Sequence, residues 1–138
     1  MRHALLDTGP LVALFDDRDQ FHAHFHAMLG DVAQPLNLHT TWPCVVEASH
    51  MLGDTARVEM LKWVGLGGAV VIPFDASGLL DMTDLMLRYT AQPRTRMDLA
   101  DASLCWLAQQ SGVTTILTLD VRDFSRYRLP DGRGFNIL

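Results

Sequence analysis

Short apolar runs that alternate with longer helix-forming segments are the feature that most constrains the fold of this chain. The runs expected to form strands lie at residues 4–6, 35–38, 69–74, 113–119 and 135–138. Each is too short for a helix of ordinary length and is bounded by turn residues. Strands that are separated by helices pair in parallel through right-handed crossovers, so the pattern predicts an α/β fold with a parallel sheet.

Helix boundary signals support this alternation. Thr8 is expected to cap a brief helix over residues 11–15, with Pro10 tolerated in its first turn. Asp75 or Ser77 is expected to cap a helix that reaches about Tyr89, and Gly112 is expected to end a helix over residues 99–110. The segments 20–32, 41–52 and 56–66 also have helical patterns.

Length and composition favour a single compact domain over residues 1–138 with one sizeable core. The net charge is −5, and only two of the 16 acidic residues are glutamates. Cys44 and Cys105 lie in helical patterns and are expected to be buried, unbridged thiols in a reducing environment. The absence of a signal-like leader or an apolar run of about 18 residues predicts a soluble, cytoplasmic protein without a membrane partner.

Four carboxylates stand at separate structural boundaries, namely Asp7, Glu47, Asp101 and Asp120. Asp7 and Asp120 each close a predicted strand, and parallel α/β sheets bind ligands outside the carboxyl ends of their strands. If the first strand and a late strand are central neighbours, both carboxylates face one crevice. Clustered oxygen ligands without cysteine favour phosphodiester hydrolysis with a divalent cation, Mg²⁺ or Mn²⁺.

Each acid also has a simpler interpretation. Asp7 and Asp120 could be helix caps or turn acids, and Glu47 could be solvated, although apolar neighbours would make an unpaired buried charge costly. Asp98 shares a helix face with Asp101 and is best interpreted as the N-cap of that helix, with a role as an additional metal ligand as the alternative.

Three further residues flank this acidic set. Asp123 is either an outer ligand or, slightly favoured, a turn acid. Thr8 and Thr118 stand beside Asp7 and Asp120, where their hydroxyls could support a carboxylate or a metal-bound water.

Four segments together resemble the motif regions of PIN domains, especially VapC-like toxins: LLDTGPLVALF, WPCVVEASHML, LADASLCWLAQQSG and ILTLDVRDFSRY. The match spans almost the whole chain, and its specificity lies in the order and spacing of the acids. The resemblance implies a PIN-like three-layer α/β/α fold with a parallel central sheet of about five strands. It also implies that Asp7, Glu47, Asp101 and Asp120 hold one or two Mg²⁺ or Mn²⁺ ions.

By the same resemblance, the chain is similar to endoribonucleases that are often homodimers inhibited by a cognate antitoxin protein. The expected products carry a 5′-phosphate and a 3′-hydroxyl, because water attacks. Six of the eleven cationic residues fall in the last third of the chain, so an acidic protein can still present a basic surface. Four of these could contact RNA phosphates, with solvated arginines as the alternative: Arg94, Arg96, Arg122 and Arg126.

Other functional interpretations remain open or are weaker. A housekeeping RNA-processing nuclease and a catalytically silent PIN-fold binding module are the alternatives to a toxin. His22, His24 and His26 form an H-x-H-x-H pattern, but only His22 and His26 face the same side of a helix, which favours surface or interface histidines over a metal site. The LLDTGP start is unlike an aspartyl-phosphate phosphatase because Gly9 stands where a second aspartate is needed.

Overall fold

The computed structural model describes residues 1–90 and 96–138 and contains five strands and seven helices in these ranges. The strands are β1 (Arg2–Leu6), β2 (Leu36–Thr40), β3 (Val70–Val71), β4 (Thr115–Leu117) and β5 (Asn136–Ile137). The helices are α1 (Thr8–Phe15), α2 (His22–Gly30), α3 (Trp42–Met51), α4 (Asp54–Gly65), α5 (Gly78–Thr90), α6 (Leu99–Ser111) and α7 (Val121–Arg126). Strands and helices alternate along the chain as the sequence predicts.

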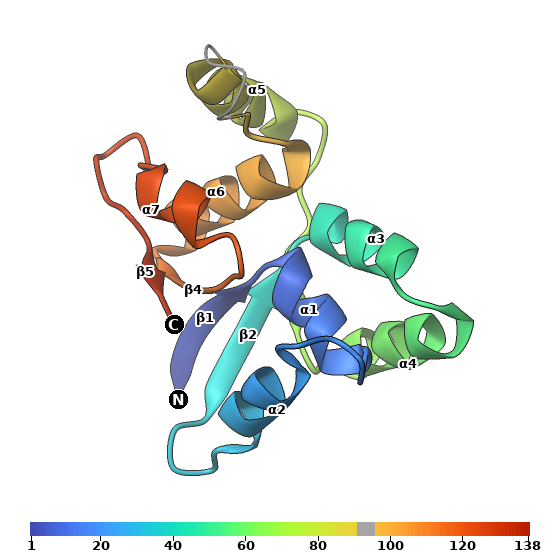
Figure 1. Cartoon of the computed structure of the whole chain (residues 1–138). Coiled ribbons are helices and arrows are strands. Elements are labelled where there is room, and N and C mark those ends of the chain that lie inside the picture. Colours follow the sequence, from blue (N-terminus) through green and yellow to red (C-terminus); the bar gives the residue numbers. More distant parts are fainter. Residues whose placement is uncertain (91–95) are drawn as a thin grey trace.

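All five strands pair in parallel in the order β3-β2-β1-β4-β5, which confirms the expected sheet (Figure 1). The strand order reverses at β1, which lies between β2 and β4. Leu5 of β1 pairs with Ile116 of β4, and Leu6 pairs with Leu117. The first strand and a late strand are therefore the central neighbours that the acidic pattern requires, and their carboxyl ends open at one switch point.

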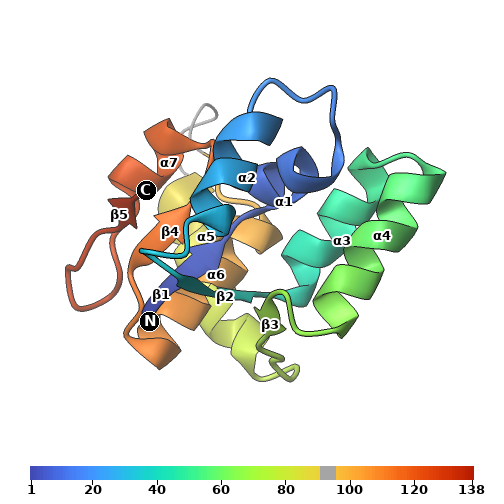
Figure 2. The ribbon, with the colours of Figure 1, turned by 90° about the horizontal axis from the view of Figure 1, so that it is seen from below.

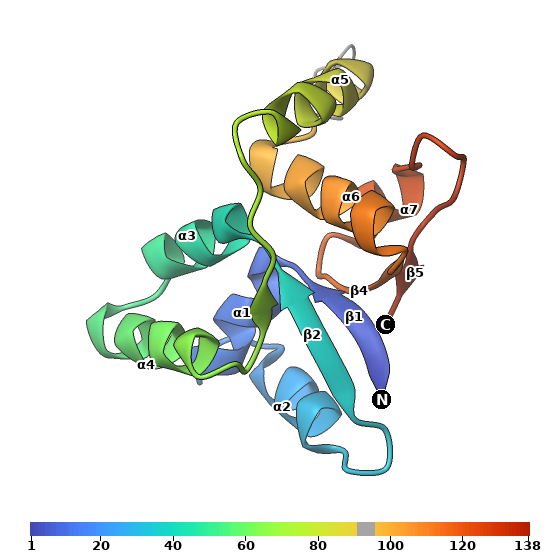
Figure 3. The same cartoon turned by 180° about the vertical axis from the view of Figure 1, so that it is seen from behind.

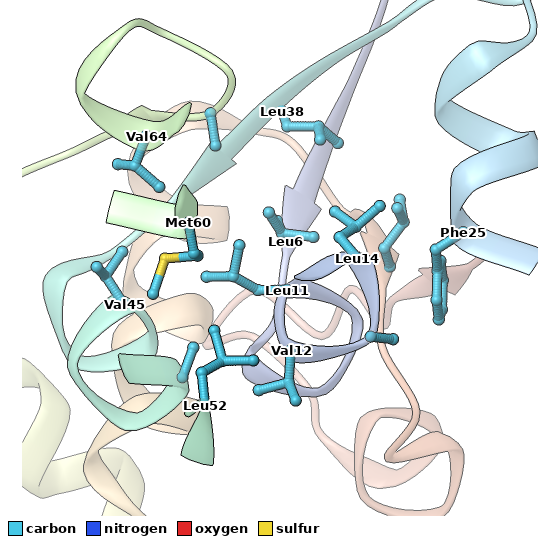
Figure 4. Packing of buried hydrophobic residues seen from close by; sticks show 14 of the residues in the cluster. Leu6, Leu11, Val12, Leu14, Phe25, Leu38, Val45, Leu52, Met60 and Val64 are labelled. Carbon is cyan, nitrogen blue, oxygen red and sulfur yellow. The ribbon is translucent and has the colours of Figure 1, made fainter. Parts of the chain in front are cut away.

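Helices cover both faces of the sheet, so the fold has the predicted three layers (Figure 2). On one face, Ala4 and Leu6 join a hydrophobic cluster with side chains of α1, α2, α3 and α4, which Figure 4 shows at close range. On the other face, Leu5 joins a second cluster built mainly from α5, α6 and α7. The alternation of side chains along one buried strand thus divides the core in two.

Several boundaries differ from the sequence-based expectation. The third strand is reduced to Val70–Val71, and β4 ends at Leu117 although its apolar run continues to Leu119. The Thr118 hydroxyl donates to Asp7 and accepts from the Asp120 backbone N–H, which draws the chain out of the strand ladder. Helix α7 was not expected, because the hydrophobic repeat over its six residues is too short to indicate a helix.

The helix caps are partly as predicted. Asp98 caps α6 by accepting from the Asp101 N–H at 2.8 Å, and Gly112 ends that helix with a left-handed φ of 75°. Asp75 accepts from the N–H groups of Ser77 and Gly78 at the start of α5. The expectation that Thr8 caps α1 is wrong: Asp7 is the cap and accepts from the Thr8 N–H.

Two expectations from composition can be compared with the described residues. Cys44 and Cys105 are free and buried, as predicted. Within residues 1–90 and 96–138, no helix is long and apolar enough to cross a membrane.

Candidate metal centre

Asp7 lies at the switch point of the sheet, directly after β1 and next to the end of β4. Its side chain is 7% exposed and accepts two hydrogen bonds, from the Thr118 hydroxyl at 2.7 Å and the Thr8 N–H at 2.8 Å. The Thr118 contact ties the ends of β1 and β4 together. Burial raises the pKa of Asp7 to about 6, although both hydrogen bonds favour the ionised form.

Asp101 reaches the same end of the sheet from the first turn of α6. It is 8% exposed, and one of its oxygens accepts from the Tyr127 hydroxyl at 2.7 Å. Burial raises the pKa of Asp101 to about 8, and the nearby charges of Asp98, Asp7 and Asp120 add to the shift. The hydrogen bond from Tyr127 works in the opposite direction because it stabilises the carboxylate.

Asp120 and Asp123 complete a compact group with Asp101. One carboxylate oxygen from each of these three residues lies within 4.8 Å of the other two. Burial, followed by the contact with Asp123, raises the pKa of Asp120. Asp123 lies in the first turn of α7 with its carboxylate near the other acids, and its role as an outer ligand stays a prediction.

Arg126 balances the charge of Asp123 from the next turn of α7. Its guanidinium donates to Asp123 Oδ1 at 2.7 Å and lies 5.4 Å from the ring centroid of Tyr127. Burial alone would raise the pKa of Asp123, but the bonds to Arg126 and Asp120 and the charges of Arg126 and Arg122 together outweigh burial and hold that pKa below its usual value. Asp123 is therefore the group member that is most readily ionised.

Glu47 approaches from α3 and differs from the other acids because its side chain is exposed. The Thr8 hydroxyl donates to Glu47 Oε2 at 3.4 Å, and burial followed by the charge of Asp98 raises the Glu47 pKa. In the described ranges Glu47 has no ion pair. Because the charge of Asp98 reaches Glu47, Glu47 lies at the edge of the same group of acids.

Asp98 interacts electrostatically with more of the site than its cap role suggested. Its charge contributes to the raised pKa values of Asp7, Glu47, Asp101 and Asp120. Since one of its oxygens accepts the Asp101 N–H, Asp98 both begins α6 and adds to the negative charge there. The capping role and the site role are compatible.

The chemistry of this donor set fits a divalent cation. Carboxylate oxygens are the ligands that Mg²⁺ and Mn²⁺ prefer, and like charges at this separation are costly unless protons or a cation neutralise them. The threonine and tyrosine hydroxyls hold individual carboxylates in place, as outer-shell groups do around metal ligands. Asp101, Asp120, Asp123 and Asp7 are the residues that could hold the ion, with Glu47 at the rim.

The four arginines proposed to contact RNA have different settings. Arg96 and Arg122 are exposed, and Arg122 is close enough to affect the Asp123 pKa. Arg126 is engaged by Asp123 and the tyrosine rings, which makes it a structural neighbour of the acids. Arg94 lies outside the described residues.

Sequence reasoning missed Tyr127, the buried hydroxyl that contacts Asp101. The only available signal was its position in the segment DFSRY, one turn after Asp123 on a helix that was not expected. Phe124 and Tyr89 pack edge-on against the Tyr127 ring and fix its direction. The Tyr127 ring packs in the hydrophobic core, while its hydroxyl supports Asp101.

The layer order, the five parallel strands and the acids at the switch point define a PIN fold, as in solved VapC structures. The crystal structure of Mycobacterium tuberculosis VapC20, a sarcin-ricin loop cleaving toxin, matches with a TM-score of 0.73 and 16% identity, covering 86% of this chain and 90% of that one. VapBC2 from Rickettsia felis, bound to a promoter DNA fragment, matches with a TM-score of 0.65 and 14% identity over 99% and 98% of the two chains.

The sequence is also similar to a curated protein. It is 28% identical over 139 residues to Ribonuclease VapC26 of Mycobacterium tuberculosis, covering 97% of this chain and 98% of that protein. No family model matches the sequence. The chain is VapC-like in both sequence and fold, as its four motifs predict.

Proposed function

We propose that the protein is a Mg²⁺- or Mn²⁺-dependent endoribonuclease that hydrolyses RNA phosphodiester bonds and acts as the toxin of a type II VapBC-like toxin-antitoxin system. The observation that carries this proposal is the group of Asp101, Asp120 and Asp123 oxygens within 4.8 Å of one another, beside the buried Asp7. The similarity to Ribonuclease VapC26 over nearly the full length of both proteins supports the activity.

A bound divalent cation would supply a water of lowered pKa and would neutralise charge on the scissile phosphate. The protein contributes placement: Thr118 holds Asp7, Tyr127 holds Asp101, and Arg126 holds Asp123. Without cation or proton, the acids would repel an RNA backbone. Thr8 supports Glu47 at the rim, from which Glu47 would add a further carboxylate to the ligand set.

Substrate binding falls to cationic groups around the acids. Arg96 and Arg122 are exposed near the amino-terminal ends of α6 and α7, and Arg94 is the third proposed phosphate contact. Arg126 is proposed to contact phosphate only indirectly, because its guanidinium is held by Asp123. Each direct contact would add salt-dependent affinity without base specificity.

The proposed partners are a cognate antitoxin and a second copy of the chain, in the cytoplasm. Structural neighbours include toxin-antitoxin complexes, namely VapBC2 of Rickettsia felis and VapBC of Salmonella typhimurium. Exposed apolar side chains on α3, including Trp42, Val46 and Met51, offer a surface that association would bury. A short reading frame beside the gene would favour the toxin over a housekeeping nuclease.

The test is cleavage of RNA by purified protein with Mg²⁺ or Mn²⁺, and again in excess chelator. We expect discrete cleavage with 5′-phosphate and 3′-hydroxyl ends, and none in chelator. An Asp101→Asn protein prepared in parallel is the control for contaminating nuclease. Cleavage at the same sites in chelator, or equal cleavage by the variant, would contradict the metal-dependent activity. An intact fold that binds a protein partner but cleaves no RNA would favour the silent binding module.

A further inference from the structure

One face of the sheet packs against α6 near the carboxyl ends of the strands. The same face is uncovered near the amino end of β1. Seen from behind, none of the helices in residues 1–90 and 96–138 crosses β2 or the amino-terminal half of β1 (Figure 3). Leu5 is fully buried on this face, whereas His3, two residues earlier, is exposed. Since side chains alternate along a strand, His3 shares the face of Leu5, and Asn37 and His39 of β2 share it through the register.

Two histidines meet on this open face. His3 Nδ1 and His39 Nε2 lie 3.0 Å apart, and the two rings are tilted by 36° with centroids 5.2 Å apart. Asn37 Nδ2 lies 3.2 Å from His3 Nδ1. Three polar side chains from two neighbouring strands therefore direct nitrogen atoms toward one accessible point.

We propose that His3 and His39, with Asn37 as a third donor, form a binding site for a borderline transition-metal ion such as Zn²⁺. Imidazole nitrogens that bind one tetrahedral ion at about 2.0–2.1 Å lie roughly 3.3 Å apart, close to the observed separation. Rings that already meet at 3.0 Å need only separate slightly to admit the ion.

Binding requires a small rearrangement of protons. In the observed contact one ring donates its N–H to the other, and a ligating nitrogen must instead offer its lone pair. The donating ring therefore moves that proton to its other nitrogen, and the metal takes its place between the rings. A half-turn of the Asn37 amide presents its oxygen to the same point, and water completes the coordination.

This site differs from the acidic centre in both chemistry and position. Two imidazoles favour zinc, nickel or copper, whereas the all-oxygen group at the far end of β1 favours magnesium or manganese. His3 lies four positions before Asp7 along β1, which corresponds to about 13 Å of extended strand, and His39 is in register with Leu5, two positions before Asp7. An ion held by His3 and His39 would join the central strand to β2 without entering the proposed active site.

The other close histidine pair lies on α2 and is held by backbone carbonyls. His22 and His26 have ring centroids 4.3 Å apart on α2, but His22 Nδ1 lies 2.7 Å from the Ala13 carbonyl and His26 Nε2 lies 2.9 Å from the Leu14 carbonyl. These bonds hold the rings against the last turn of α1. The two histidine pairs can thus be compared in one experiment.

The experiment is a zinc titration of the full-length, untagged protein in saturating Mg²⁺, followed by calorimetry and by melting temperature. We expect Zn²⁺ to raise the melting temperature of the wild type, because an ion that binds only the native state stabilises it. His3→Ala and His39→Gln should weaken zinc affinity by at least about tenfold, since even outer-shell changes at metal sites cost about 10- to 100-fold. His50→Ala, at an exposed histidine of α3, is the matched control and should bind as the wild type does.

Specific outcomes would overturn the site. Unchanged zinc affinity in His3→Ala would do so, and this exposed position keeps the test valid even if His39→Gln folds poorly. Loss of zinc binding in His26→Ala alone would assign the ion to the α2 pair. Loss in Asp101→Asn alone would assign it to the acids. Absence of any zinc binding by the wild type would equally reject the proposal, whether or not RNA cleavage is observed.

Discussion

Acids gather at the carboxyl end of β1 and two histidines meet near its amino end, and burial shifts the pKa values of the two sets in opposite directions. At the carboxyl end, burial raises the pKa of Asp7 to about 6 and of Asp101 to about 8, so both acids hold their protons to a higher pH than ordinary aspartates do. Where His3, near the amino end, meets His39 of β2, burial and then His3 lower the pKa of His39, so that histidine tends to lose its proton. Both ends favour neutral side chains in the absence of a cation, and both present atoms that a cation could bind.

The largest expected effect tests the carboxyl end. Asp101→Asn should abolish RNA cleavage. Above about pH 8, where Asp101 is ionised, it should also raise the melting temperature in chelator, because it removes one of several repelling charges while its amide oxygen can still accept from Tyr127. The wild type should gain more than the variant when Mg²⁺ is added. If Asp101 acted only through the helix dipole, the variant would lose about 0.3–1 kcal/mol and respond to Mg²⁺ like the wild type. Melting curves with and without Mg²⁺ decide between these outcomes.

The free energy of unfolding of the metal-free protein should depend on pH through the acids at the carboxyl end of β1. Asp7 and Asp101 have native pKa values of about 6 and 8, above the ordinary value of 3.8, so the native state binds more protons than the unfolded state between these limits. Stability should therefore fall as the pH rises from about 4 to 8. The check is urea unfolding in chelator across this range, and Asp101→Asn should flatten the upper part of the profile. A wild type that is most stable at pH 8 would contradict the raised pKa values.

Tyr127→Phe should have an intermediate effect. The change removes the hydroxyl that stabilises ionised Asp101 at 2.7 Å, so the Asp101 pKa should rise further. A hydrogen bond to a charged group contributes about 1.5–3 kcal/mol. The pH needed for half of the Mg²⁺-induced rise in melting temperature should shift upward. Phe135, which packs on the same aromatic cluster without a hydroxyl, supplies the packing control through Phe135→Leu.

Removing exposed arginines should change RNA binding more than stability. Arg96→Ala and Arg122→Ala should each weaken binding and lower the slope of log affinity against log salt by about 0.7 per lost phosphate contact with single-stranded RNA. Mg²⁺ affinity should stay nearly constant, because neither residue is among the acids. Filter binding at several salt concentrations, with a catalytically inactive background, is the measurement. Unchanged slopes in both variants would make them ordinary solvated arginines.

The smallest effect on stability should come from His39, and its pH dependence should have the opposite sign to that of the acids. Because the native pKa of His39 is lowered below 6.5, the native state binds fewer protons than the unfolded state as the pH falls through that value. His39 should therefore cost stability on acidification, while the acids gain it. His39→Gln should be relatively more stable than the wild type at pH 5.5 than at pH 8. Equal pH profiles for the two proteins would remove this contrast between the ends of the strand.

The sequence predicted the fold and the general location of the acids because both follow from repeated local patterns. The alternation of apolar runs and caps indicated a parallel sheet, and Asp7 and Asp120 followed strands that prove to be linked through Thr118. The site roles of these residues stay predictions. Helix α7 was missed because six residues carry too little periodicity, and with it the orientation of Asp123 was lost.

The histidine pair was invisible to sequence patterns for a different reason. His3 and His39 are 36 residues apart, and their contact depends on the register of β1 with β2. The H-x-H-x-H pattern was conspicuous, yet two of its rings are held by backbone carbonyls at the end of α1. Local spacing identified histidines that share a helix face, whereas strand register determined which rings meet.

The hydrogen bond from Thr118 to Asp7 can form only late in translation, because its partners are 111 residues apart. At ordinary translation rates Thr118 follows Asp7 from the ribosome by roughly 5–20 s. During that interval β1 can pair with β2, but the nascent chain lacks the residues from α6 onward that bring the other carboxylates. If the protein is the proposed toxin, an incomplete chain still attached to its ribosome does not cleave the RNA around it. The antitoxin is then needed only once the last strands have emerged.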